Sequence, residues 1–85
     1  MVQFDFKIND SNGIHARPAG LVVKEASKFT SDISIEFKGK TADAKKIFAI
    51  MSMGLKKDDV ITVITNGEDE KEAAETLESF MQANL

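Results

Sequence analysis

The 85-residue chain contains no cysteine, no tryptophan and no tyrosine, and only one histidine and one proline. Without cysteine, a disulfide framework, a thiol nucleophile and thiolate metal ligands are excluded. A single histidine also argues against a zinc site, because such sites draw mainly on Cys and His. No apolar run approaches the roughly 18 residues of a membrane span, and the opening MVQFDFKIND does not resemble a signal peptide. We therefore expect a cytoplasmic protein with no metal, no other cofactor and no membrane insertion.

The chain also lacks an excess of basic residues. Eleven Lys and Arg residues against fourteen Asp and Glu residues give a net charge of -3, with a pI near 5.0. Domains that bind nucleic acid usually carry a basic excess, so we expect no nucleic-acid partner. The length suits one small domain, and no linker or low-complexity segment divides it, so residues 1–85 are predicted to form a single domain.

Hydrophobic periodicity predicts seven elements along the chain. Alternating or β-prone segments predict strands at residues 2–8, 33–37, 41–44 and 60–65. Helical spacing of apolar residues predicts helices at residues 16–29, 45–53 and 68–84. The order βαββαβα predicts an α+β fold, a two-layer open-faced sandwich with three helices on one face of a four-stranded, mainly antiparallel sheet.

Residues 13–20 (GIHARPAG) place the only histidine where a predicted turn becomes a helix. Pro18 suits a first helical turn, where N–H groups lack intrahelical partners anyway. The N–H groups of Ala16 and Arg17, with the positive end of the helix dipole, can hold an anion beside His15. The Arg17 guanidinium suits phosphate oxygens, and an imidazole nitrogen can attack phosphorus. We therefore predict catalytic roles for His15 and Arg17, and phosphate binding by Ala16, Arg17 and Pro18.

Taken one at a time, these residues also fit a plainer interpretation. A lone histidine at the start of a helix is more often a capping or surface residue than a nucleophile. Proline is common in first helical turns, and arginine is not unusual there. Isolated features would therefore support only an anion site, and the octet as a whole carries the stronger hypothesis.

The octet resembles the signature of HPr, the histidine-containing phosphocarrier family of the bacterial phosphoenolpyruvate:sugar phosphotransferase system. The resemblance extends over essentially the whole chain, including EASKF at 25–29, the segment 45–54 and the NGEDE turn at 66–70. It implies the fold predicted above. It also implies that phosphorylated enzyme I transfers a phosphoryl group to Nδ1 of His15, that Arg17 assists, and that sugar-specific IIA units receive the group. The chain would then be a carrier with no turnover of its own.

The short predicted second helix is more apolar than a surface helix needs, and the family has an apolar docking patch there. The resemblance implies that the first helix completes this face and that nearby lysines steer acidic partners. The predicted partner-binding residues are Gly20, Leu21, Lys24, Ser27, Lys45, Lys46, Ile47, Phe48 and Met51. Core packing is the alternative for the apolar residues, and a solvated face is the alternative for the lysines. We expect a monomer that binds enzyme I, IIA units and, as a secondary expectation, regulatory proteins.

Two positions depart from the family pattern. HPr proteins of low-GC Gram-positive bacteria have a regulatory serine after Lys45, and this chain has Lys46 there, which cannot accept that phosphate. Ser52 on the same predicted helix is interpreted as an exposed serine. Gly20 stands where the family mostly has alanine or threonine, and a helical glycine costs up to about 1 kcal/mol relative to alanine.

Two other functions compete with phosphoryl carriage. Catabolite-repression HPr-like proteins carry glutamine at the histidine position and act through the regulatory serine. The opening MVQ and the GEDE turn resemble that branch, but His15 is present and the serine is absent. The main alternative is therefore an HPr-like regulatory module that binds a transcription factor or enzyme without carrying phosphate. A hydrolase with His15 as general base lacks a nucleophile or carboxylate partner in the motif.

Overall fold

The computed structural model describes all 85 residues, which form four strands and three helices. The strands are β1 (Val2–Lys7), β2 (Asp32–Phe37), β3 (Lys40–Asp43) and β4 (Val60–Asn66). The helices are α1 (Ala16–Ala26), α2 (Ile47–Met51) and α3 (Glu70–Asn84). All seven predicted elements are present in the predicted order, so the βαββαβα architecture is confirmed. No helix is both long enough and apolar enough to cross a membrane.

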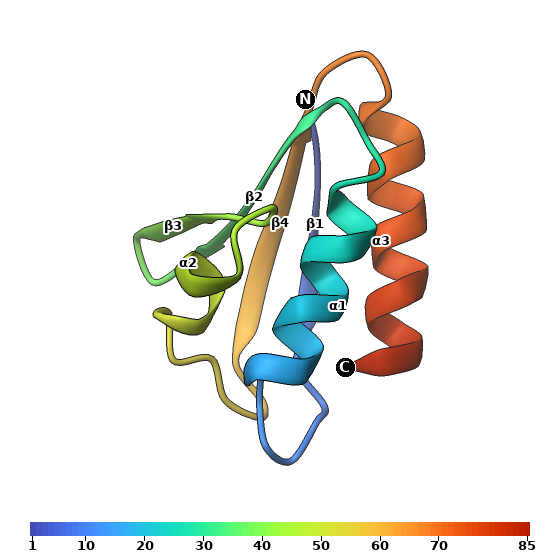
Figure 1. Ribbon diagram of the computed structural model, residues 1–85. Coiled ribbons are helices and arrows are strands. Elements are labelled where there is room, and N and C mark those ends of the chain that lie inside the picture. Colours follow the sequence, from blue (N-terminus) through green and yellow to red (C-terminus); the bar gives the residue numbers. More distant parts are fainter.

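The sheet has the strand order β1-β4-β2-β3, and every neighbouring pair is antiparallel. Phe4 of β1 lies opposite Val63 of β4, which in turn lies opposite Ile35 of β2. Figure 1 shows α1 and α3 side by side on one face of this sheet, with α2 on the side of α1 away from α3. The core therefore lies between the helices and one face of the sheet.

Small residues let the helices lie close to the sheet. Ala19 and Ala26 of α1 and Ala73 of α3 are completely buried. Larger core side chains come mainly from the strands and from the inner face of α3. They include Ile33, Ile35, Ile61, Val63, Leu77 and Met81. This burial of apolar surface is the main favourable term in folding, and the alternation in the strands and the helical spacing both predict it correctly.

All three helices are shorter than the periodicity predicts, and α3 differs only in beginning two residues later, at Glu70. The prediction for the second helix, residues 45–53, is wrong at both ends, because α2 covers only Ile47–Met51. Asp43 holds the preceding turn, since its carboxylate accepts from the Lys45 N–H at 2.9 Å and its carbonyl accepts from the Lys46 N–H at 3.0 Å. The first helix ends at Ala26, before Phe29, because the chain tightens there into hydrogen bonds that span three residues.

Asp69 ties the segment after α1 to the turn before α3. Its carboxylate accepts hydrogen bonds from the Thr30 and Ser31 N–H groups, each at 2.9 Å, and from the Ser31 hydroxyl. These donors, first the Ser31 hydroxyl and then the Thr30 N–H, lower the pKa of Asp69 from 3.8 to about 2. Because folding lowers this pKa, the tie stabilises the fold above about pH 4 and is lost as the pH falls towards 2.

We expect Asp69→Asn to reduce the free energy of unfolding at pH 6, because the amide keeps an acceptor oxygen but loses the charge. The difference from the parent chain should shrink as the pH falls from 4 to 2, since the parent carboxylate is then protonated too. Urea unfolding followed by circular dichroism at several pH values measures this. Glu75→Gln, on the exposed side of α3, is the matched control. A difference between Asp69→Asn and the parent that does not change with pH would contradict the assignment.

Candidate functional site

His15 is the N-cap residue of α1. Its main chain is extended, with φ -110° and ψ -166°, and its side chain makes no capping hydrogen bond. The His15 carbonyl accepts the first hydrogen bond of the helix, from the Ala19 N–H at 2.9 Å. The side chain is exposed. His15 therefore starts the helix with its main chain alone and leaves its imidazole free for an external partner.

The first turn of α1 presents free donors next to this imidazole. The N–H groups of Ala16 and Arg17 donate none of the 20 main-chain hydrogen bonds that lie outside regular helix and strand pairing. Pro18 has no N–H, so the missing intrahelical partner costs nothing at that position. Arg17 is exposed and takes part in none of the three ion pairs of the protein. Two N–H groups, a free guanidinium and the helix dipole thus favour an anion beside His15.

A pocket of about 360 Å³ opens beside the histidine. The residues that line it come from the loop before α1, from α1 and from the end of α3. They are Asp10, His15, Arg17, Pro18, Leu21 and Asn84. A pocket of this volume holds several water molecules, so it leaves room for a small anion beside the imidazole.

Two of these lining residues were not predicted from the sequence. Around Asp10 the sequence predicts only the turn before the helix, and the Asp10 carboxylate does accept the Asn12 N–H at 2.8 Å within that turn. Asn84 lies in the last turn of α3, far along the chain from the histidine. No local pattern links the two segments, and only the tertiary fold brings them to one pocket.

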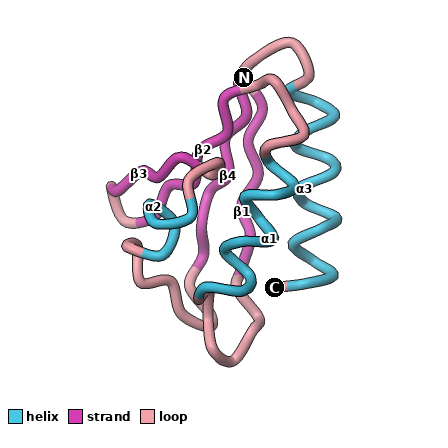
Figure 2. The backbone as a smooth tube through the Cα atoms, in the orientation of Figure 1, coloured by secondary structure: helices cyan, strands magenta, loops and turns pink.

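Exposed apolar side chains gather where α1 and α2 meet. The exposed fractions are 39% for Leu21, 80% for Phe48 and 37% for Met51, which makes them three of the five exposed large hydrophobic residues of the chain. Figure 2 shows α2 next to α1, the helix that begins at the histidine. We call Leu21, Phe48 and Met51 the apolar patch. Burial against a partner is the natural role for such a cluster.

The other residues predicted for this surface differ in accessibility. Gly20 and Ile47 are half-buried in the contact between α1 and α2, and Ile47 packs against the core. Core packing therefore accounts for much of Ile47, as the alternative interpretation held. Lys24, Ser27 and Lys46 are exposed. Their charged and hydroxyl groups are available around the apolar patch.

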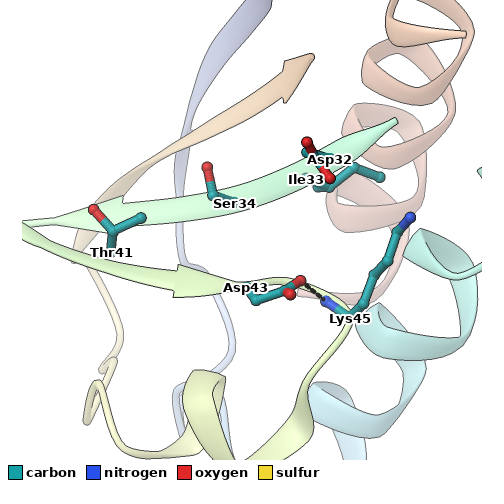
Figure 3. Close-up of a pocket in the computed structure, with 6 residues that line it drawn as sticks. All are labelled: Asp32, Ile33, Ser34, Thr41, Asp43 and Lys45. Carbon is teal, nitrogen blue, oxygen red and sulfur yellow. Dashed lines mark hydrogen bonds between the residues drawn. The ribbon is translucent and has the colours of Figure 1, made fainter. Parts of the chain in front are cut away.

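Lys45, predicted from the sequence to bind a partner, makes a contact within the chain. Its ammonium donates to the Phe29 carbonyl at 2.7 Å, beyond the end of α1 that is opposite the histidine. Lys45 also lines a second pocket, which has a volume of about 280 Å³. Figure 3 shows Lys45 there with Asp32 and Asp43. That pocket shares no residue with the one beside His15. The Lys45 ammonium thus joins two segments of the fold.

Comparison with known proteins shows to which family the chain belongs. Residues 2–83 match the family model described as the PTS HPr component phosphorylation site. The chain belongs to the HPr family. The members of this family are phosphocarrier proteins of the phosphotransferase system (PTS), so the resemblance inferred from the sequence is confirmed.

Individual HPr relatives agree along nearly the full length. The phosphocarrier protein HPr of Buchnera aphidicola subsp. Baizongia pistaciae is 48% identical over 81 residues, which are 95% of each chain. The crystal structure of HPr from Thermoanaerobacter tengcongensis superposes with a TM-score of 0.93 at 38% identity, covering 98% of this chain and 93% of that one. Crh, the Bacillus subtilis catabolite repression protein, gives a TM-score of 0.79 at 41% identity, covering 100% and 98%.

We expect Gly20→Ala to stabilise the protein by about 0.5–1 kcal/mol, because alanine has the higher helix propensity. The added Cβ would lie 3.6 Å from Cδ1 of Ile47, an ordinary van der Waals contact. Thermal unfolding should show a rise in Tm of roughly 4–8 °C per kcal/mol. Gly39→Ala is the control, since φ is +80° at Gly39 and the substitution should destabilise. A fall in Tm for Gly20→Ala would show that α1 and α2 cannot accommodate the methyl group.

Proposed function

We propose that this HPr-family chain carries a phosphoryl group on His15, received from phosphorylated enzyme I and delivered to sugar-specific IIA units in the cytoplasm. The observation that carries the proposal is the free imidazole at the start of α1, beside two free N–H groups and an unpaired guanidinium. A phosphoryl group on histidine has nearly two negative charges, and these donors complement them. The chain acts as a co-substrate and has no turnover of its own.

The transfer is a displacement at phosphorus without any change of oxidation state. The Nδ1 lone pair of His15 attacks the phosphorus, and the bond from phosphorus to the donor group of enzyme I breaks. The electron pair of that bond leaves with the donor. The Arg17 guanidinium and the N–H groups of Ala16 and Arg17 offset the charge on the equatorial oxygens. In the second transfer the IIA nucleophile attacks the phosphorus. The bond between phosphorus and Nδ1 breaks, and its electron pair returns to Nδ1 as the lone pair.

The apolar patch, together with half-buried Ile47 and Gly20, is proposed as the docking surface for both partners. Phe48 is the most exposed of its side chains, and aromatic side chains that become buried on binding often dominate the energy of an interface. Lys24 and Lys46 add positive charge on an acidic protein, which favours encounter with acidic partners. Because all these groups lie on one chain, we propose that the monomer is the acting form.

Lys46 removes one regulatory route. Lysine has no hydroxyl group to phosphorylate, and its positive charge is opposite to that of a phosphoserine. We therefore propose that regulation through a phosphorylated serine at this position does not operate in this chain. The competing function, an HPr-like regulatory module without phosphoryl carriage, retains the apolar patch but needs no histidine.

We expect one phosphoryl group to be added when the protein is incubated with phosphoenolpyruvate, magnesium and enzyme I, and none to be added to His15→Ala. Intact-mass analysis at neutral and acid pH measures this, since phosphohistidine is lost in acid. Ser52→Ala is the control, because it removes the hydroxyl group of α2 without touching the histidine. A folded parent protein that gains no mass with active enzyme I would contradict carriage and favour the regulatory module.

Arg17→Ala and Phe48→Ala are expected to affect different kinetic constants. Loss of the guanidinium should lower the kcat of phosphoryl transfer by on the order of a hundredfold, because it interacts with charge at the reacting phosphorus. Loss of the exposed Phe48 ring should raise KM by about tenfold and change kcat little. Steady-state transfer assays over a range of carrier concentrations separate these effects. An unchanged kcat for Arg17→Ala would remove the guanidinium from the mechanism.

A further inference from the structure

The loop that leads to His15, residues 9–14, lies against the segment that follows α2, and we call it the histidine loop. The Ile14 N–H donates to the Leu55 carbonyl at 3.1 Å. At the other end of the loop, the Ile8 N–H donates to the Asp59 carbonyl at 2.9 Å, and the Asp58 N–H donates to the Ile8 carbonyl at 2.7 Å. The histidine loop is therefore held to residues 55–59 at both of its ends by main-chain hydrogen bonds.

Between these hydrogen bonds the two segments approach too closely for any side chain. Gly13 is buried and has a φ of +68°. A Cβ at this position would lie 2.2 Å from the Leu55 carbonyl oxygen and 2.8 Å from Cα of Lys56, and real Cβ atoms essentially never come within 3.0 Å of another heavy atom. Both obstacles are main-chain atoms, so no side-chain rotation relieves the clash. Only separation of the two segments does.

We propose that Gly13 is a positioning residue for phosphoryl transfer, because its contact with Leu55 fixes His15 relative to the apolar patch. The inference rests on the proposed function. The imidazole has no capping hydrogen bond, so its place depends on the main chain of the loop. Leu55 is 3% exposed and follows α2, which carries Phe48 and Met51. The contact therefore sets how far the reacting nitrogen stands from the surface on which a partner docks.

The rest of the loop cannot absorb a displacement easily. The Gly13 N–H donates to the Asp10 carbonyl at 2.9 Å, and the Asp10 N–H donates to the Leu85 main-chain oxygen at 2.7 Å. The loop is thus held against the end of α3 as well as against residues 55–59. A side chain at position 13 would shift the start of α1, and with it His15. Misplacement of reacting groups by about 1 Å can cost on the order of a hundredfold in rate.

The test compares Gly13→Ala with Gly39→Ala. Both glycines have positive φ, +68° and +80°, so both substitutions place alanine in a left-handed conformation. Only position 13 adds a clash, because nothing lies within 4 Å of a Cβ at position 39. We expect Gly13→Ala to lower the kcat of transfer from enzyme I by roughly tenfold to a hundredfold, with KM within about twofold of the parent value. Gly39→Ala should leave both constants unchanged.

The assay is run at a temperature where unfolding curves show both variants fully folded. An unphosphorylated parent protein would overturn the proposed function itself. A phosphorylated parent with an unchanged kcat for Gly13→Ala, or with a change in KM alone, would overturn only the positioning role. If Gly13→Ala does not fold, Ile14 is replaced by the matching α-hydroxy acid, which deletes the N–H donor to Leu55 and adds no atom. An unchanged kcat for that chain overturns the proposal, and a reduced kcat with unchanged KM supports it.

Discussion

The hydrogen bond from the Ile14 N–H to the Leu55 carbonyl joins the two parts of the molecule on which the proposed function depends. Ile14 directly precedes His15 and the first turn of α1, and Leu55 lies in the segment that follows α2. Because the imidazole itself is unrestrained, the main chain must determine where it stands. The free N–H groups of Ala16 and Arg17 gain their orientation from the same contact, since they begin the helix that it anchors. The proposed anion site thus depends mainly on main-chain geometry, with Arg17 as its one charged donor.

The opposite end of α1 is held by a different kind of contact. There the Asp69 carboxylate accepts hydrogen bonds from the Thr30 and Ser31 N–H groups. The acceptor is a charged group, whereas the Leu55 carbonyl that accepts from the Ile14 N–H is neutral. The helix that starts at the histidine is therefore fixed at both ends to segments distant in sequence. The contact made by Asp69 weakens in acid, because its strength depends on an ionised carboxylate.

The sequence predicted the seven elements because hydrophobic periodicity is a local property. His15 and Arg17 could be proposed from the sequence because the candidate anion site lies within a few consecutive residues at the start of one helix. The sequence missed Asn84 and the role of Asp10, because the pocket is assembled by the packing of α3 against the histidine loop. The sequence predicted a steering role for Lys45 but not the hydrogen bond from its ammonium to the Phe29 carbonyl, sixteen residues away. The predicted ends of α2 were wrong because Asp43 accepts hydrogen bonds from the Lys45 and Lys46 N–H groups before the helix, and because hydrogen bonds that span three residues follow it.

The apolar patch is small, and its most prominent member is a single ring, that of Phe48. As the proposed docking surface for both partners, it would hold a donor or an acceptor but not both at once. The complex with the phosphoryl donor must then dissociate before the complex with the acceptor can form. A relay of this kind runs fastest when every complex is short-lived, and residence time is governed mainly by the dissociation rate. A larger apolar patch would hold each partner longer and would slow the flow of phosphoryl groups through the carrier.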